Sequence, residues 1–212
     1  MNESIIKTIE ALKKNNMNAF YAETKEEAVK KVEELLTHGA TVTFGGSMSL
    51  KAAGVIDLIK NGNYNLLDRA TITDEKSKKE FFSKAYVADY FLSSSNAVTE
   101  DGILYNVDGN ANRISMIVHG PDKVIMVVGK NKIVKTLDDA VYRVKTVAAP
   151  KNCVRLGIDT YCAKMGKCVS LIKENSKIYD GCNRICCDYL ISAKQRVEGR
   201  INIIIVNEDL GY

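Results

Sequence analysis

The sequence contains few of the residues that several common kinds of site require. Tryptophan is absent, aromatic residues make up 7% of the chain, and two histidines occur among 212 residues. Because no stretch interleaves basic and aromatic residues, we expect no nucleic-acid partner. Neither His38 nor His119 has a nucleophile and an acid in its sequence surroundings. No nucleophile, histidine and acid set is therefore predicted.

Long apolar runs are also missing. The longest, such as residues 123–129 (KVIMVVG), have the length of a strand, whereas a membrane-spanning helix needs roughly 20 apolar residues. The N-terminal stretch MNESIIKTIEALKKNN lacks the charged start, apolar middle and cleavage site of a secretory signal. We therefore expect a cytoplasmic protein with no membrane partner, in which the six cysteines are reduced rather than paired in disulfides.

What the chain does contain favours one globular domain over residues 1–212. Apolar residues make up 46% of the sequence, enough for a substantial core. Charged residues make up 26% with a net charge of +4, and the lysines are spread along helical stretches such as KEEAVKKVEELL. This spacing indicates a solvated surface. A homo-oligomer is an alternative that the composition leaves open.

Helical and extended signals alternate along the chain. Helical periodicity or capping patterns predict helices over residues 3–15, 24–39, 47–62, 74–88 and 136–149, the last ending before Pro150. Short apolar runs predict strands at residues 40–44, 64–68 and 201–212, and extended pieces within 89–109. Two further apolar pieces, residues 113–120 and 123–129, are separated by a Gly-Pro-Asp turn. This alternation predicts an α/β fold with a largely parallel sheet covered by helices on both faces. Residues 151–200 hold all six cysteines and no long periodic element, so we expect a cysteine-rich insert there.

The stretch FGGSMSL at residues 44–50 lies between a predicted strand and a predicted helix. Ligands of open α/β sheets gather at the carboxyl ends of strands, where glycines let backbone N–H groups approach an anion. Gly45 and Gly46 would permit the turn, and the hydroxyls of Ser47 and Ser49 would donate to a phosphate or carboxylate. A plain helix N-cap at Ser47 explains the stretch equally well.

A second polar stretch follows the apolar residues YFL. In residues 93–113, Glu100 and Asp101 are candidate catalytic acid and base, and Arg113 is a candidate for holding a carboxylate or phosphate. Asn96 and Asn110 are candidates for orienting the ligand. The alternative is a hairpin whose Asp-Gly pairs serve the backbone turns alone.

The cysteines form a third group. Cys162, Cys168, Cys182 and Cys186 would supply four thiolates for zinc or an iron–sulfur cluster, although five and three residues separate the members of the two pairs, unlike a zinc ribbon. The alternative is a set of packed, reduced thiols. Cys153 is expected to be a buried apolar residue, and Cys187 a spare neighbour of Cys186.

Two lysines follow the apolar run at residues 123–129. Lys130 and Lys132 lie in the sequence GKNKIV, where a strand ends, so both are candidates for facing a ligand crevice. Exposure in a turn is the stronger expectation for both.

Several blocks together resemble the lactate utilisation (LUD) domain family. They are FGGSMSL, SSSNAVTEDGILYNVDGNANRI, HGPDKVIMVVGKNKIV, DDAVYRVKTVAAPKNCVRL and GRINIIIVNEDLGY, in the family's order over nearly the whole chain. The resemblance implies a fold of the glucosamine-6-phosphate deaminase, ribose-5-phosphate isomerase and CoA-transferase type. It also implies a substrate site lined by the glycine-serine loop and the SSSNAVTEDG loop, with Gly45, Gly46, Ser47, Asn96, Glu100, Asp101 and Gly102.

The same resemblance implies a function in organic-acid metabolism. Family members resemble one component of a multi-protein system that oxidises L-lactate to pyruvate with iron–sulfur partners. The chain has no complete dinucleotide-binding fingerprint, which argues against a dehydrogenase acting alone. The alternatives are an isomerase-like or transferase-like enzyme that binds a small carboxylate or phosphorylated ligand, and a metal-binding accessory or assembly subunit. The cysteine-rich tail departs from the family pattern, because Ser170 and Leu171 stand where a further thiol is expected.

Overall fold

A parallel sheet of six strands forms the centre of the computed structural model, which describes residues 2–172 and 183–212. All five strand pairings are parallel, and this confirms the predicted α/β fold with a mostly parallel sheet. In spatial order the strands are β1 (Asn18–Ala22), β10 (Ile201–Val206), β7 (Lys123–Gly129), β4 (Tyr90–Ser93), β2 (Thr41–Phe44) and β3 (Asn65–Leu67).

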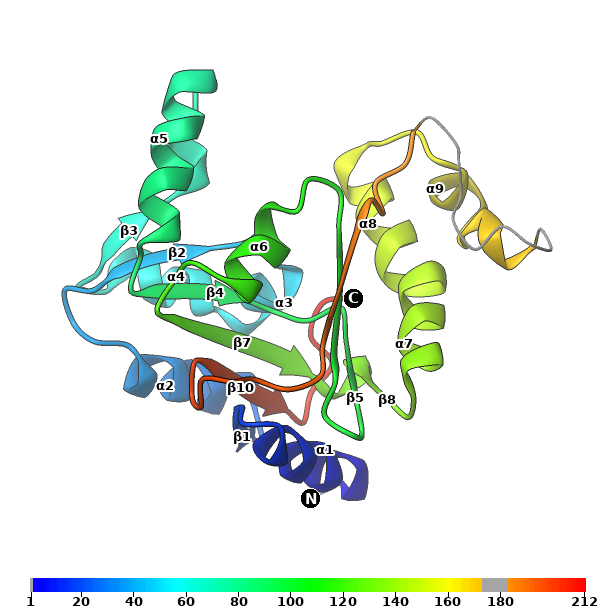
Figure 1. Ribbon diagram of the computed structural model, residues 1–212, viewed down its shortest axis with the longest axis horizontal. Coiled ribbons are helices and arrows are strands. Elements are labelled where there is room, and N and C mark those ends of the chain that lie inside the picture. Colours follow the sequence, from blue (N-terminus) through cyan, green and yellow to red (C-terminus); the bar gives the residue numbers. More distant parts are fainter. Residues whose placement is uncertain (1, 173–182) are drawn as a thin grey trace.

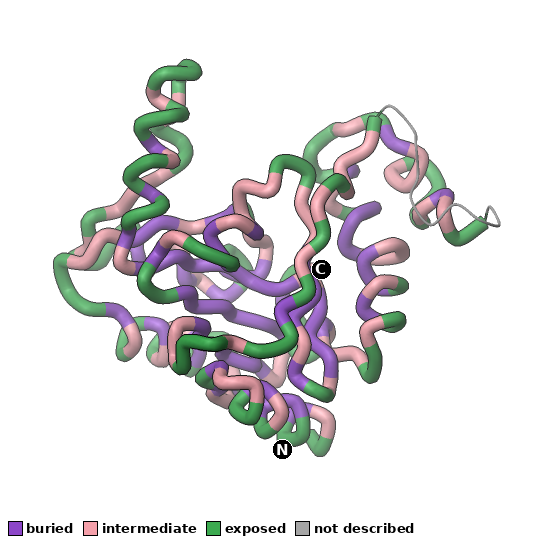
Figure 2. Tube along the Cα trace, viewed as in Figure 1, coloured by how far each residue is buried: buried purple, intermediate pink, exposed green. Residues whose placement is uncertain are grey.

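Helices cover both faces of this sheet (Figure 1). Successive residues of a strand point to opposite faces, so Ile203 of β10 packs into one apolar cluster and Ile204 into the other. Figure 2 shows the strands as the buried centre of this layered arrangement. One face packs against α1 (Glu3–Lys14), α5 (Glu75–Tyr86) and α6 (Asn112–Val118), and the other against α2 (Lys25–Leu35), α3 (Met48–Ala53) and α4 (Val55–Asn61).

A second, four-stranded sheet was not predicted. β6 pairs antiparallel with both β5 and β9, and β5 pairs parallel with β8. Its outer face packs against one long helical segment that shares a cluster with Ala97 and Tyr105. The strands are β8 (Ile133–Val134), β5 (Ala97–Thr99), β6 (Leu104–Asp108) and β9 (Asp188–Ser192), and the helical segment is α7 (Leu137–Arg143), a π-helical turn (Val144–Ala148) and α8 (Ala149–Leu156).

Two predicted helix boundaries were wrong. The predicted helix over residues 47–62 is divided at Gly54, whose φ of 84° lies in the left-handed region and ends α3 before α4 begins. The predicted stop at Pro150 does not occur, because Pro150 lies at the start of α8, directly after the π-helical turn. The helical backbone continues from the π-helical turn into α8, and the changed hydrogen-bond pattern of that turn is where a helix can accept a proline, which lacks an N–H.

The cysteine-containing segment 151–200 is only partly separate from the sheets. Its described residues include α9 (Tyr161–Met165), a 3-10 turn (Val169–Leu171) and β9, which belongs to the second sheet. Because β9 pairs with β6 over five residues, the segment is not a simple insert. Along the described ranges, every helix is too short or too polar to cross a membrane.

Candidate functional site

The main cavity lies at the carboxyl ends of β2, β4 and β7. It has a volume of about 560 Å³ and is lined by Gly46 and Ser47 after β2, residues 93–96 at the end of β4, and Lys132 after β7. The π-helical turn, α8, residues 107–113 and residues 184–186 complete its wall. Parallel strands bring these loops together because their carboxyl ends meet at one edge of the sheet.

The glycine-serine loop forms one side of this cavity. Gly46 and Ser47 line it, while Gly45 packs behind, where an added Cβ would lie 3.3 Å from the Phe91 ring. The Ser47 hydroxyl accepts the Leu50 N–H at 3.3 Å. The stretch therefore combines the two interpretations, because Ser47 caps α3 and also faces the cavity.

Asn96 and Asn110 both line the cavity, and their role in orienting a ligand stays a prediction from the sequence. The Asn96 side-chain oxygen accepts the Val107 N–H at 2.9 Å and so joins the loop after β4 to β6. A ligand that contacts Asn96 would therefore meet a side chain already bonded to the backbone.

Arg113 lines the cavity, but its guanidinium is held by the protein. It pairs with Asp108 at 2.7 Å, and the two side chains are 13% and 9% exposed. Nη1 donates to the Asn106 side-chain oxygen at 2.6 Å, and Nη2 donates to that of Asn96 at 2.8 Å. Arg113 therefore connects α6, β6 and the loop after β4, and its expected role in holding a ligand carboxylate or phosphate stays a prediction.

Lys132 is the cavity residue that sequence reasoning placed least well. The expectation of an exposed turn lysine is met by Lys130 but is wrong for Lys132, which is 4% exposed. Its Nζ donates to the hydroxyls of Ser49, at 2.7 Å, and Ser94, at 3.2 Å. Ser49 is itself buried, and its hydroxyl donates to the Leu210 carbonyl at 2.9 Å. Ser49 therefore supports Lys132 rather than lining the cavity.

The electrostatic surroundings of Lys132 favour the neutral amine. Burial is the main cause, followed by the positive charges of Arg143 and Arg113, and together they lower its pKa to about 7. Among the described residues, no carboxylate forms a hydrogen bond or ion pair with Lys132. The sequence carries one signal for Lys132, its place three residues after Gly129, the end of the buried strand β7, but exposed Lys130 shares that signal.

Glu100, Asp101 and Gly102 lie outside this cavity. The Glu100 carboxylate accepts from the Ser4 hydroxyl at 2.7 Å and from Lys7 at 2.9 Å, and these contacts lower its pKa. Gly102 has a φ of 82° and packs against α1, where an added Cβ would lie 2.7 Å from the Ala11 carbonyl carbon. The turn between β5 and β6 thus rests on α1, and the catalytic assignment of Glu100 and Asp101 stays a prediction from the sequence.

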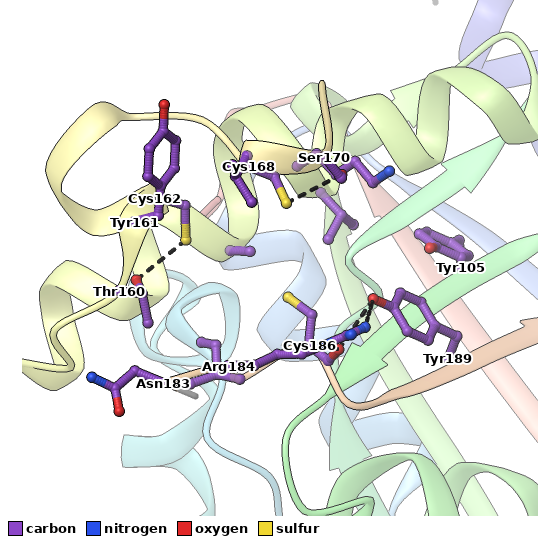
Figure 3. A pocket seen from close by; sticks show the side chains of 15 residues that line it. Tyr105, Thr160, Tyr161, Cys162, Cys168, Ser170, Asn183, Arg184, Cys186 and Tyr189 are labelled. Carbon is purple, nitrogen blue, oxygen red and sulfur yellow. Dashed lines mark hydrogen bonds between the residues drawn. The ribbon is translucent and has the colours of Figure 1, made fainter. Parts of the chain in front are cut away.

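A smaller pocket of about 50 Å³ gathers several thiols (Figure 3). Cys162 on α9, Cys168 and Cys186 point into it from three segments of the chain, among the side chains of Tyr105 and Tyr189. Behind them, the sulfur of buried Cys153 lies 3.6 Å from that of Cys162. Burial raises the pKa of Cys186 to about 12 and that of Cys153 to about 11.

These thiols do not form a ready metal site. In residues 2–172 and 183–212, no three histidine, cysteine or acidic side chains are grouped closely enough to hold a metal ion. Cys182, the fourth predicted ligand, lies outside the described residues. Cys187 is exposed, in keeping with its expected place outside the ligand set.

Comparisons with known proteins agree with the fold. The chain resembles the crystal structure of a DUF162 family protein from Deinococcus radiodurans, with a TM-score of 0.55 and 14% identity over 96% of each chain. A weaker match, to eIF2B delta from Chaetomium thermophilum, has a TM-score of 0.34 and 14% identity over 65% of this chain and 53% of that one. No curated protein matches significantly. The profile of the LUD domain matches residues 5–206, and the chain therefore belongs to the LUD domain family.

Proposed function

We propose that the main cavity binds a small carboxylate or phosphorylated metabolite, as part of organic-acid metabolism of the lactate-utilisation type. Membership of the LUD domain family supports a lactate-utilisation role in general. Action with iron–sulfur redox partners in L-lactate oxidation is the more specific form of this proposal. A CoA-transferase-like ancestry of the fold would be consistent with such a cavity.

The observation that carries the proposal is the charge of the cavity wall. Asp108 is the acidic residue among the lining side chains, and Arg113 already pairs with it. Positive charge is therefore in excess even when Lys132 is neutral, and an anionic ligand would be attracted to the cavity. The basic lining residues are Arg69, Arg113, Lys132, Arg155 and Arg184.

Calorimetric titration with L-lactate, pyruvate and a sugar phosphate tests this proposal. Arg155→Met should weaken binding by about 10- to 150-fold, since a hydrogen bond to a charged group contributes about 1.5–3 kcal/mol. Lys130→Met removes the same charge from an exposed residue beside the cavity lining, and should leave the affinity unchanged. Equal weakening in both variants, or no binding of any probe, would contradict the proposal.

A third variant distinguishes the structure from the expectation based on sequence. Glu100→Gln should leave ligand affinity unchanged, because Glu100 contacts Ser4 and Lys7 of α1. Loss of binding in this variant would instead support the catalytic assignment of the turn between β5 and β6.

A second function rests on the thiols. We propose a metal-binding accessory or assembly role as the alternative, because Cys162, Cys168 and Cys186 face one pocket. They lack the close grouping of a metal site, so binding of zinc or an iron–sulfur cluster would have to draw them together.

Metal analysis of protein purified without oxygen tests this alternative. A Cys168→Ser, Cys186→Ser variant should lose bound iron with its visible absorption, or bound zinc without colour. Cys187→Ser is the matched control, since Cys187 is exposed. Metal-free, well-folded protein would exclude the alternative and leave the main cavity as the functional site.

A further inference from the structure

The amine of Lys132 has surroundings suited to covalent chemistry. Its Nζ lies in the main cavity wall and contacts two neutral hydroxyls, those of Ser49 and Ser94. A buried ammonium ordinarily pairs with a carboxylate, and no described residue supplies one. The protein therefore keeps an amine at the ligand site without the partner that would hold its proton.

Two nearby arginines also disfavour the protonated form of Lys132. Arg143 is 8% exposed, and its guanidinium donates to the backbone carbonyls of Asn131 and Asn96 at 3.0 and 2.7 Å. With Arg113 it lowers the pKa of Lys132. Desolvation and a neighbouring cation are the two conditions that turn a lysine into a nucleophile for carbonyl compounds.

We propose that Lys132 forms an imine with the carbonyl carbon of a small carbonyl compound that carries a carboxylate or phosphate group. This inference rests on the proposed function, because the basic residues of the cavity wall would hold the anionic group. A 2-oxo acid or a phosphorylated ketone has the required pair of groups, an electrophilic carbon and an anion within a few bonds of it.

The reaction balances without a redox partner. The nitrogen lone pair forms the C–N bond as the carbonyl π pair moves to oxygen, which takes up a proton. The carbinolamine hydroxyl then leaves as water with the proton that the nitrogen gives up, which yields a neutral imine, and uptake of a proton from solvent gives the charged imine. The hydroxyl of Ser94, 3.2 Å from Nζ, is placed to pass a proton between nitrogen and oxygen.

Borohydride trapping on the full chain tests the imine. The probes are pyruvate and dihydroxyacetone phosphate, with acetone as the uncharged control. Intact mass should increase by the mass of the anionic probe less one oxygen atom, and peptide mapping of the wild-type chain should place the adduct on Lys132. Lys132→Met should reduce the adduct by about tenfold or more, whereas Lys130→Met should leave it unchanged.

The outcomes separate this inference from the proposed function. A pyruvate adduct would identify a carboxylate ligand, and an adduct with the sugar phosphate a phosphorylated one. Calorimetric binding of a probe without an adduct on Lys132 would overturn the imine and leave the cavity as an anion site. Adducts spread over surface lysines, or equal labelling by acetone, would also overturn it. Failure of both probes to bind would overturn the imine, and failure of L-lactate to bind as well would overturn the proposed function with it.

Discussion

Replacing Arg113 with methionine is expected to lower the free energy of unfolding by about 3–5 kcal/mol, the typical cost of removing one partner from a buried ion pair. The change would leave the Asp108 carboxylate, 9% exposed, without its counter-charge. It would also remove the donors to the side-chain oxygens of Asn106 and Asn96. Chemical denaturation of the two proteins measures the difference.

Two controls separate loss of the paired guanidinium from loss of charge. Arg113→Lys should recover only part of the stability, because an ammonium cannot reproduce the forked contacts of a guanidinium. Arg69→Met removes an exposed arginine of the same cavity and should change the free energy of unfolding by about 0.5 kcal/mol or less. A loss of similar size in Arg69→Met and Arg113→Met would argue against the structural role of Arg113.

Replacing Lys132 with methionine is expected to stabilise the protein at pH 6, by about 2–4 kcal/mol, since each unit of pKa shift corresponds to about 1.4 kcal/mol. In the folded chain the Lys132 pKa is about 7, against 10.5 for an ordinary lysine. Below pH 7 the wild-type chain keeps a buried charge in the folded state, whereas the variant does not. Lost hydrogen bonds to Ser49 and Ser94 offset part of the gain.

The sign of the pH dependence follows from proton uptake. Between pH 7 and 10.5 the unfolded chain binds more protons at Lys132 than the folded chain, so this group makes wild-type stability rise with pH. The charged groups acting on it are Arg143 of α7 and Arg113 of α6. The advantage of the variant should therefore shrink toward pH 10.

Urea denaturation of wild-type, Lys132→Met and Lys130→Met proteins at several pH values measures this dependence. Lys130 is exposed, so its variant should follow the wild-type curve. A constant difference between Lys132→Met and wild type across the range would mean that Lys132 keeps its charge in the folded state.

Local patterns predicted most of the elements because they record which side of an element is buried. The nearly continuous apolar run of β10 follows from its burial on both faces of the central sheet, and the helical spacing of Ile5, Ile9 and Leu12 follows from packing against one face. Capping residues were equally informative, since Thr24 begins α2 through its contact with Glu27, as predicted. The predictions failed at Gly54 and Pro150, because a glycine or a proline can lie either within a helical stretch or at its end.

The candidate site was only half predictable for the same reason. Ser47, Asn96 and Asn110 line the cavity, and each follows a predicted strand or occupies a polar turn, features visible in the sequence. Glu100 has the same sequence context, but its side chain turns toward α1. There its carboxylate accepts a hydrogen bond from Lys7, 93 positions away in the sequence. The residue type alone does not distinguish a carboxylate in a cavity from one paired on the surface.

The sequence by itself determined the α/β class, the parallel sheet and the position of the loops after β2 and β4, since these depend on short-range periodicity and on the geometry of parallel strands. Only the tertiary structure decided which side chains share the cavity. Lys132 meets Ser49 across 83 positions of sequence, and the burial that lowers its pKa comes from elements distant along the chain. Chemistry at this site therefore depends on long-range packing, which no local pattern records.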